Sequence, residues 1–223
     1  MARVCVFDVN ETLLDLGALD PHFERVYGDA GVRRSWFLQL LQSALVATVT
    51  GVYSDFGTIG AAALEMVAER EGVYLSEEDK QEILGGMREL PPHPEVAKSL
   101  ERLREAGLRT ATLTNSTREV AEAQMENSGL RGYFEQILSA DAVKRLKPAP
   151  EPYMMAAESL GVEIGQVRLV AHSWDVAGAL RAGCAAAFVA RPGMVLDPLV
   201  ERPDVVGVDL REVADRVLEV ETG

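Results

Sequence analysis

The stretch CVFDVNETLLDL, residues 5–16, decides the fold because it changes character after its third residue. The β-rich run RVCVF, residues 3–7, is short and bounded by polar residues, which is typical of a buried strand. Asp8 follows that run directly, and Glu11 comes three residues later, just ahead of a threonine. On position alone Asp8 could be an ordinary helix cap, so its purpose depends on the rest of the chain.

Similar strand-like runs recur along the chain. They lie at 109–113, 136–138, 167–171, 185–189 and 205–208. Helical patterns separate them, for example PEVAKSLERLREAG, which ends at Gly107. Strands that alternate with helices of this length predict an α/β fold built from βαβ units around a parallel sheet. Reactive groups in such a sheet lie at the carboxyl ends of the strands.

One long segment interrupts this alternation. Residues 16–90, called the helical segment below, contain no convincing strand but carry the long helical patterns WFLQLLQSALVATVT, TIGAAALEMVAEREG and SEEDKQEILGGMREL. Its connections are residues 17–21 and the PPHP run at 91–94, whose prolines cannot continue a helix. We therefore expect an all-helical cap domain, 16–90, inserted into a core domain formed by 1–15 and 91–223.

Composition and charge narrow the classes of protein to which the chain can belong. Its 223 residues are 48% hydrophobic, enough for a substantial core, and carry a formal net charge of −13. That charge argues against nucleic acid as a partner, and an anionic substrate would need a locally basic or amide-rich pocket. No apolar run suits a membrane span or a signal peptide, so we expect a cytoplasmic protein. Cys5 and Cys184 fit buried free thiols in that compartment, and their spacing predicts no metal site.

Polar side chains gather in three further segments, two of them at the ends of predicted strands and one in a proline-rich turn. They are Thr114, Asn115 and Ser116 in TLTNS, Lys147 and Tyr153 in RLKPAPEPY, and His172, Ser173 and Asp175 in VRLVAHSWDVAGAL. The TLTNS stretch is where a strand turns into a helix, and a helix N-terminus favours anions. Lys147 alone would be read as a solvated surface charge.

Together these segments resemble the haloacid dehalogenase superfamily. The shared pattern is a strand-end DxxxT, here Asp8 to Thr12, a Thr-Asn pair after the second core strand, a Lys-Pro pair, and an aspartate before a helix rich in small residues. The resemblance covers essentially the whole chain. It implies a Rossmann-like core, a helical cap over the strand ends, and Asp8 as a nucleophile that forms a covalent ester.

Two departures select a branch of that superfamily. Its phosphatases carry a second aspartate two residues after the nucleophile, where this chain has Asn10, and an amide cannot give and recover a proton. They also bind magnesium through a Gly-Asp pair, where this chain has Ala171-His172, and magnesium prefers oxygen ligands. Both departures favour a resemblance to the L-2-haloacid dehalogenases, which implies an enzyme with no metal and no cofactor.

The reaction implied by this resemblance has two steps. Asp8 displaces halide from C2 of a short L-2-haloacid with inversion, and water then attacks the Asp8 ester to free a 2-hydroxy acid. Lys147 would keep Asp8 ionised, and Thr12 would share in catalysis. The resemblance further implies substrate contacts from the backbone N–H groups of Val9 and Asn10, the Thr114 hydroxyl, Asn115, Tyr153 and Ser173.

Glu11 and His172 depart from the branch pattern together. The branch usually has glycine at the place of Glu11 and a Ser/Asn-rich stretch at the place of His172. Because both residues follow neighbouring strands, we hypothesise a dyad in which Glu11 orients His172 and His172 takes the proton from the hydrolytic water. The alternative is a first-turn carboxylate and a packed core histidine. Asp175, the base or orienter in the usual scheme, could do the same work.

The halide site also differs from the branch pattern. The branch supplies an arginine from the cap, and this chain has Phe37 at or near that place. Arg33 and Arg34 lie a turn away, where a solvated surface pair is the simpler interpretation. We expect Trp36 and Phe37 to help Asn115 surround the halide, since aromatic edges carry partial positive charge. Packing between helices is the alternative for both aromatic residues.

Two other functions stay open at this point. One is a magnesium-dependent phosphatase of the same superfamily, and the other is a catalytically silent binding protein on the same scaffold. Asp8, Thr12 and Lys147 argue against the silent protein, because a pure binder needs no nucleophile. The resemblance also implies a homodimer. The halide, the chain length of the acid and the physiological substrate stay open.

Overall fold

The structure, a computed structural model, describes residues 3–223 apart from the side chain of Ser173. Its centre is a parallel six-stranded sheet in the order β3-β2-β1-β4-β5-β6. The strands are β1 Val4–Phe7, β2 Thr110–Thr114, β3 Gln136–Ser139, β4 Val167–Ala171, β5 Ala185–Val189 and β6 Val205–Gly207. Each end lies within one residue of its predicted place, so the predicted α/β fold is confirmed.

The central strand β1 decides where the site lies. Phe7 pairs with Thr112 on β2 and with Val170 on β4, so the residues that follow these three strands meet at one edge of the sheet. The side chains of β1 alternate between two hydrophobic layers. Cys5 and Phe7 face one layer, and Val4 and Val6 face the other.

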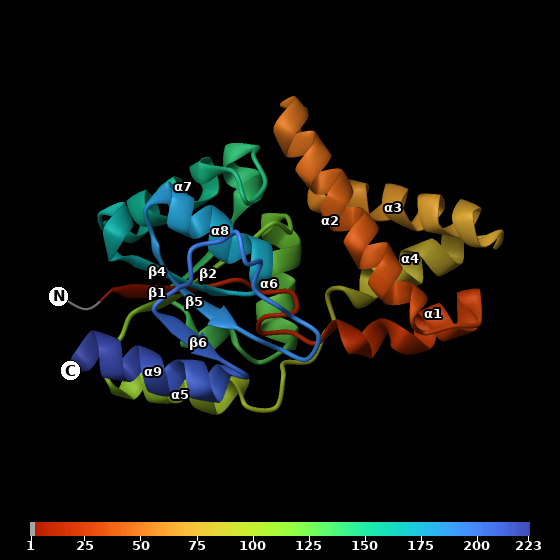
Figure 1. Ribbon diagram of the computed structural model, residues 1–223. Coiled ribbons are helices and arrows are strands. Elements are labelled where there is room, and N and C mark those ends of the chain that lie inside the picture. Colours follow the sequence, from red (N-terminus) through yellow and green to blue (C-terminus); the bar gives the residue numbers. More distant parts are fainter. Residues whose placement is uncertain (1–2) are drawn as a thin grey trace.

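Helices cover both faces of the sheet (Figure 1). One face carries α5 Val96–Glu105, α6 Arg118–Asn127 and α9 Leu210–Thr222, and the other carries α7 Pro150–Leu160 and α8 Ser173–Ala182. Short 3₁₀ turns are η2 Arg131–Tyr133, η3 Ala140–Val143 and η4 Ile164–Gln166. Helix α6 begins after Thr117, whose hydroxyl accepts the Val120 N–H at 3.4 Å and caps the helix.

The helical segment consists of helices joined by short turns and contains no strand among its described residues, as predicted. It contains η1 Leu16–Leu19, α1 Asp20–Tyr27, α2 Val32–Thr50, α3 Phe56–Glu71 and α4 Glu77–Gly86. Figure 1 shows these helices gathered to one side of the sheet. One continuous hydrophobic cluster joins them to a face of the sheet, with Trp36 and Phe7 among its members. The division of the chain into two domains stays a prediction.

The two connections of the helical segment run side by side. Leu14 and Pro92 form an antiparallel bridge, the Asp15 N–H donates to the Pro91 carbonyl at 2.9 Å, and the His93 N–H donates to the Leu13 carbonyl at 3.0 Å. The chain therefore leaves the sheet and returns to it at one point, directly beyond β1.

Cys5 and Cys184 are buried and unpaired, as predicted. Within residues 3–223, none of the helices combines the length and the apolar character that crossing a membrane requires.

Candidate active site

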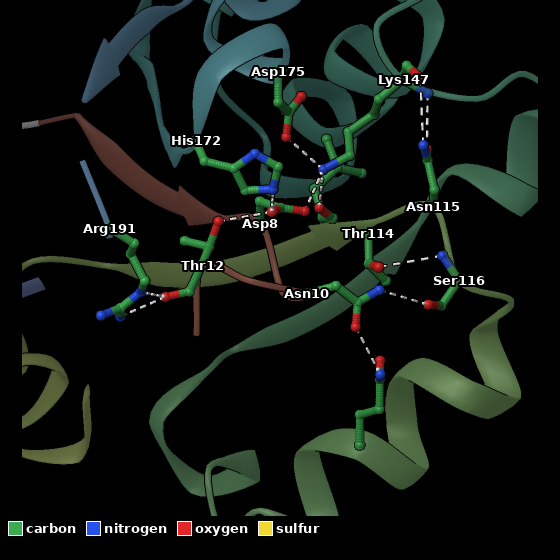
Figure 2. A network of polar contacts seen from close by, with 12 residues as sticks. Asp8, Asn10, Thr12, Thr114, Asn115, Ser116, Lys147, His172, Asp175 and Arg191 are labelled. Carbon is green, nitrogen blue, oxygen red and sulfur yellow. Dashed lines mark hydrogen bonds and ion pairs between the residues drawn. The ribbon is translucent and has the colours of Figure 1, made fainter. Parts of the chain in front are cut away.

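The Asp8 carboxylate lies directly after β1 and is held by three side chains (Figure 2). Its Oδ1 accepts a hydrogen bond from Lys147 Nζ at 2.8 Å. Its Oδ2 accepts one from Thr12 Oγ1 at 2.7 Å and lies 3.3 Å from His172 Nε2. The Asp8 side chain is 10% exposed, so it keeps a narrow opening for an incoming molecule.

Lys147 uses all three of its ammonium protons inside the protein. Besides Asp8, its Nζ donates to Asp175 Oδ2 at 2.6 Å and to the Leu113 carbonyl at 2.8 Å. An ammonium group has three donors and no acceptor, so Lys147 is fully satisfied as a cation. The other Asp175 oxygen accepts a hydrogen bond from the Tyr153 hydroxyl. Lys147 is thus a rigid positive charge between two buried carboxylates.

This arrangement fixes the charge of Asp8. Burial by itself would raise the pKa of Asp8, but attraction to Lys147 and the hydrogen bond from His172 outweigh it and hold that pKa well below its usual range. For Lys147 the balance has the opposite sign, because burial would lower its pKa whereas Asp175 and Asp8 raise it. Asp8 is therefore an ionised carboxylate, as a nucleophile must be.

His172 is the N-cap residue of α8, and its ring is buried. Burial would lower the pKa of His172, but the hydrogen bond and the charge of Asp8, assisted by Glu11 and Asp175, raise it. The resting site therefore favours a protonated imidazole beside the ionised Asp8. The ring also meets Trp174 edge-on, with 6.0 Å between the ring centroids.

Glu11 occupies a tight turn after Asp8. Its backbone has φ +61°, a left-handed conformation that is uncommon outside glycine. The turn closes because the Glu11 N–H donates to the Leu14 carbonyl at 2.9 Å, while the N–H groups of Leu13 and Leu14 donate to the Val9 carbonyl. Burial raises the pKa of the Glu11 carboxyl, and His172 and Arg33 oppose this rise. The hydrogen bonds and ion pairs of the described residues join His172 to Asp8 and include none between His172 and Glu11.

Two backbone donors near Asp8 are free in the described part of the chain. Asp8 N–H donates to the Val170 carbonyl at 3.0 Å and Glu11 N–H to Leu14, but the N–H groups of Val9 and Asn10 have no backbone acceptor among residues 3–223. The carbonyl group of Val9, in contrast, is used in the turn. Two adjacent free amides beside an ionised Asp8 suit a small anion.

The side chain of Asn10 is held from two sides. Its Nδ2 lies 3.4 Å from Ser116 Oγ, and its Oδ1 accepts a hydrogen bond from Gln124 Nε2 at 2.9 Å. Gln124 Nε2 also donates to the Met87 carbonyl at 2.8 Å. Gln124 escaped prediction because it lies on the buried face of α6, where only the folded structure brings it to Asn10.

Thr114 ends β2 and Asn115 follows it, beside Lys147. Asn115 Oδ1 accepts the Lys147 N–H at 2.8 Å, and Asn115 Nδ2 donates to the Lys147 carbonyl at 3.3 Å. The Asn115 amide therefore holds the backbone that carries the ammonium group. Thr114 Oγ1 accepts the Ser116 N–H at 3.2 Å, which leaves its hydroxyl proton for another partner.

Two neighbouring cavities adjoin these groups. A small one lies against Asp8, Asn10, Thr114, Asn115 and Lys147. A larger one, of about 690 Å³, contains Glu11 and Arg34 in its wall. The residues common to both walls are Phe37, Leu41, His172 and Trp174. The shared residues, His172 among them, thus stand between the larger cavity and the smaller one at Asp8.

Some predicted residues lie elsewhere. Trp36 belongs to the packing of the helical segment, where it is fully buried, lies 5.4 Å from Phe23 between ring centroids, and donates from Nε1 to the Gly60 carbonyl at 3.0 Å. Tyr153 stands behind Asp175 and orients that carboxylate. The Ser173 side chain lies outside the described residues. Arg33 is an ion-pair partner of Asp20 rather than a solvated arginine, and it also borders the larger cavity.

Comparison with known proteins places this geometry in a family. A family model described as haloacid dehalogenase-like hydrolase matches residues 2–183. Haloacetate dehalogenase H-2 of Moraxella sp. (strain B) is 30% identical over 201 residues, 89% of this chain and 90% of that protein. (S)-2-haloacid dehalogenase 1 of Pseudomonas sp. (strain CBS-3) is 32% identical over 180 residues, 79% of either chain.

Solved structures agree with these relatives. The L-2-haloacid dehalogenase from Xanthobacter autotrophicus with chloropropionic acid covalently bound is 26% identical and superposes over 100% of both chains with a TM-score of 0.91. Because the family model spans most of the chain and curated relatives reach 30% identity over most of their length, the chain belongs to the haloacid dehalogenase-like hydrolases, as its motifs predict.

Proposed function

We propose that the protein hydrolyses short L-2-haloacids to 2-hydroxy acids through a covalent ester on Asp8. The observation that carries this proposal is the Asp8 carboxylate, kept ionised by Lys147 and open to a small cavity beside two free backbone amides. The relatives named above carry dehalogenase names, and the Xanthobacter structure holds chloropropionic acid covalently.

The first step needs an ionised carboxylate and a bound substrate. The substrate carboxylate would accept hydrogen bonds from the N–H groups of Val9 and Asn10 and from the Thr114 hydroxyl. An Asp8 oxygen would then attack C2 and expel the halide from the opposite side, so that a C–O bond replaces the carbon–halogen bond. The halide would leave toward Asn115 and the aromatic wall that includes Phe37.

The second step needs a base that takes a proton from water. His172 suits this role because the charge of the neighbouring Asp8 changes between the two steps. In the resting site the ionised Asp8 raises the pKa of His172. Esterification removes that negative charge, so the pKa of His172 falls and the imidazole can lose its proton. Neutral His172 would then accept a proton from the water that attacks the ester carbonyl, while Glu11 stabilises the imidazolium that forms. The bond between the Asp8 carbonyl carbon and the substrate oxygen would then break, and that oxygen would take the proton back as the 2-hydroxy acid leaves and the Asp8 carboxylate is restored.

Asp175 is a poorer base in this arrangement. One of its oxygens accepts from Lys147 Nζ at 2.6 Å, and the other accepts from Tyr153. One oxygen thus holds the lysine and the other is held by Tyr153, and among the described residues Asp175 borders neither cavity. Asn10 likewise stands where a phosphatase of this family would need a proton donor, and its amide is committed to Ser116 and Gln124.

The test is halide release by the purified protein from L- and D-2-chloropropionate, with EDTA present. We expect release from the L-acid alone and none from the Asp8→Ala variant. Release from neither acid would contradict the proposed function. In His172→Ala an ester on Asp8 should accumulate and appear as an added mass on the peptide that contains Asp8. Wild-type rates of ester hydrolysis in that variant would contradict the His172/Glu11 dyad.

We also propose that two copies associate through α2. This helix exposes Leu38, Val46 and Val49, the last with 85% of its surface open to solvent, and Val52 follows its end. Apolar side chains so gathered on one helix suit a second identical copy. Light scattering after size exclusion should give a dimer for the wild type and a monomer for Val49→Asp.

The free thiols Cys5 and Cys184 suit a reducing compartment such as the cytoplasm.

A further inference from the structure

Arg191, which follows β5, makes an unusual pair of contacts with the nucleophile loop, residues 8–14. Its Nε and Nη2 both donate to the Thr12 carbonyl, at 3.1 Å and 2.7 Å (Figure 2). We propose that Arg191 is a positioning residue, whose guanidinium clamps this loop so that Thr12 holds Asp8 in its reactive orientation. The inference rests on the proposed function, and it adds a residue that contacts no reacting atom.

Thr12 transmits the position of the guanidinium to the nucleophile. It is fully buried, its carbonyl oxygen accepts from Arg191, and its hydroxyl donates to Asp8 Oδ2 at 2.7 Å. A buried carbonyl that loses charged donors must find another partner, and this requires the peptide to move. Movement of that peptide displaces the hydroxyl that sets the direction of the Asp8 carboxylate.

The turn before Thr12 has a reason to move. Glu11 adopts φ +61°, and a non-glycine residue remains in this region only where its surroundings hold it there. The Arg191 contact lies on the next residue along the chain, so it opposes relaxation of Glu11 to an ordinary backbone conformation. The clamp therefore also fixes the direction of the Glu11 side chain.

The guanidinium is anchored independently of the loop. Its Nη1 lies 2.8 Å from Glu95 Oε1, and the same oxygen accepts the Leu210 N–H at 3.2 Å. Glu95 precedes α5 and Leu210 begins α9, so the anchor belongs to the helices on one face of the sheet. A lysine cannot reproduce these bonds, because its single ammonium lacks the planar fork that reaches both partners.

The activity test is a double-mutant cycle between Arg191→Lys and Thr12→Val. Arg191→Lys should lower kcat for L-2-chloropropionate roughly ten- to a hundredfold, because small misplacements of reacting groups are costly. In the Thr12→Val background the same substitution should cost less than about threefold, since the link to Asp8 is already gone. Losses that multiply, or wild-type kcat in Arg191→Lys, would overturn the clamp.

Arg168 offers a matched control. It too is a buried arginine, bound to Asp204, to Glu221 and to the Ala186 carbonyl, but it lies near the opposite end of its strand from His172. Arg168→Lys should lower the melting temperature and leave kcat of the folded enzyme unchanged. A comparable loss of kcat in both variants would show that destabilisation alone explains the effect of Arg191→Lys, and would overturn the proposal.

A second readout needs no enzyme activity. Arg191→Lys should lower the melting temperature less when Glu11→Gly is also present, because glycine adopts the left-handed conformation without strain. Equal losses in the two backgrounds would overturn the clamp. If the wild-type protein releases no halide, the proposed function fails, whereas this comparison of melting temperatures still decides whether Arg191 holds the turn.

Discussion

Gly178 on α8 lies against Pro148, so close that a Cβ on the glycine would stand 2.5 Å from Pro148 Cβ and 2.5 Å from the Tyr153 hydroxyl. Real Cβ atoms do not approach other atoms so closely. Pro148 follows Lys147, and Tyr153 orients Asp175. The close packing of Gly178 therefore positions both the Lys147 side chain and the Asp175 carboxylate that binds it. A glycine inside a helix usually weakens it, which makes close packing the reason for this one.

Gly178→Ala should therefore destabilise the protein by about 1–3 kcal/mol, as overpacking of a core does, although alanine is the better helix former. Halide release should fall with it, because Pro148 and Tyr153 must shift. Urea unfolding and initial rates measure both effects. Gly85→Ala is the matched control, since Gly85 lies in α4 with nothing within 4 Å of its added Cβ. That substitution should stabilise by up to about 1 kcal/mol and leave activity intact.

Lys147→Met should lower kcat on the order of a thousandfold, by loss of the charge that keeps Asp8 ionised. It should also destabilise by about 3–5 kcal/mol, because two carboxylates would remain buried without their cation. Lys144→Met is the control, since Lys144 is an exposed partner of Asp141 in the same stretch of chain. Similar rates for the two variants would contradict the role given to Lys147.

The ion pair between Asp8 and Lys147 should also appear in the free energy of unfolding of the wild type at low pH. The pKa of Asp8 is lower in the folded protein than its usual 3.8, so its contribution is fully present above that value and is lost as pH falls further. In Lys147→Met the lowering of the Asp8 pKa should shrink, because only His172 then opposes the effect of burial, so the free energy of unfolding should fall less steeply below pH 4. Urea unfolding at a series of pH values compares the two slopes, and parallel slopes would argue against the ion pair.

His172 should change its proton affinity during the catalytic cycle. In the free enzyme its pKa is raised above the usual 6.5 by Asp8, Glu11 and Asp175 against the effect of burial. Its contribution to stability is therefore complete below pH 6.5 and lost as pH rises through the raised pKa. In the ester the Asp8 charge is gone, so breakdown of the ester should titrate with a lower pKa. NMR titration gives the pKa of His172 in the free enzyme, and single-turnover rates at a series of pH values give its pKa in the ester. Identical pKa values would contradict the proposal that loss of the Asp8 charge lowers the pKa of His172.

Tyr53 ties the far end of the helical segment to the core. Its hydroxyl donates to Asp141 in η3, and Lys144 Nζ lies 5.1 Å from its ring centroid. Phe56, three residues later, borders the cavity at Asp8. Tyr53→Phe should raise KM roughly two- to fivefold, the effect of losing one partly exposed hydrogen bond, and speed hydrogen exchange at the start of α3. Tyr74→Phe is the control because Tyr74 is 89% exposed. No difference between the variants would contradict this tie.

Prediction from the sequence works best where local chemistry decides the outcome. The strands are predictable because runs such as VRLVA are short, β-rich and bounded by polar residues, and parallel pairing then brings Asp8 and His172, which follow β1 and β4, to one edge. Contacts between distant, individually ordinary residues are not predictable. Arg191 meets Thr12 across 179 positions, and Gln124 meets Asn10 across 114, with no local pattern to mark either pair.

The roles of aromatic residues were harder to predict for a different reason. Trp36 and Phe37 are adjacent on one helix, so their side chains point about 100° apart and only one of them can face the site. Phe37 borders both cavities, whereas Trp36 packs inside the helical segment. Hydrophobicity alone cannot tell these two directions apart, because both are apolar.

The pairing of Leu14 with Pro92 holds the two ends of the helical segment side by side at one edge of the sheet. An insertion whose two ends meet in this way can be replaced with little change to the path of the strands, provided that the replacement covers the apolar surface that the helices now cover. Helices of another shape, grafted at Leu14 and Pro92, would surround the same Asp8 carboxylate with a different cavity. The choice of substrate can thus evolve apart from the chemistry performed on it.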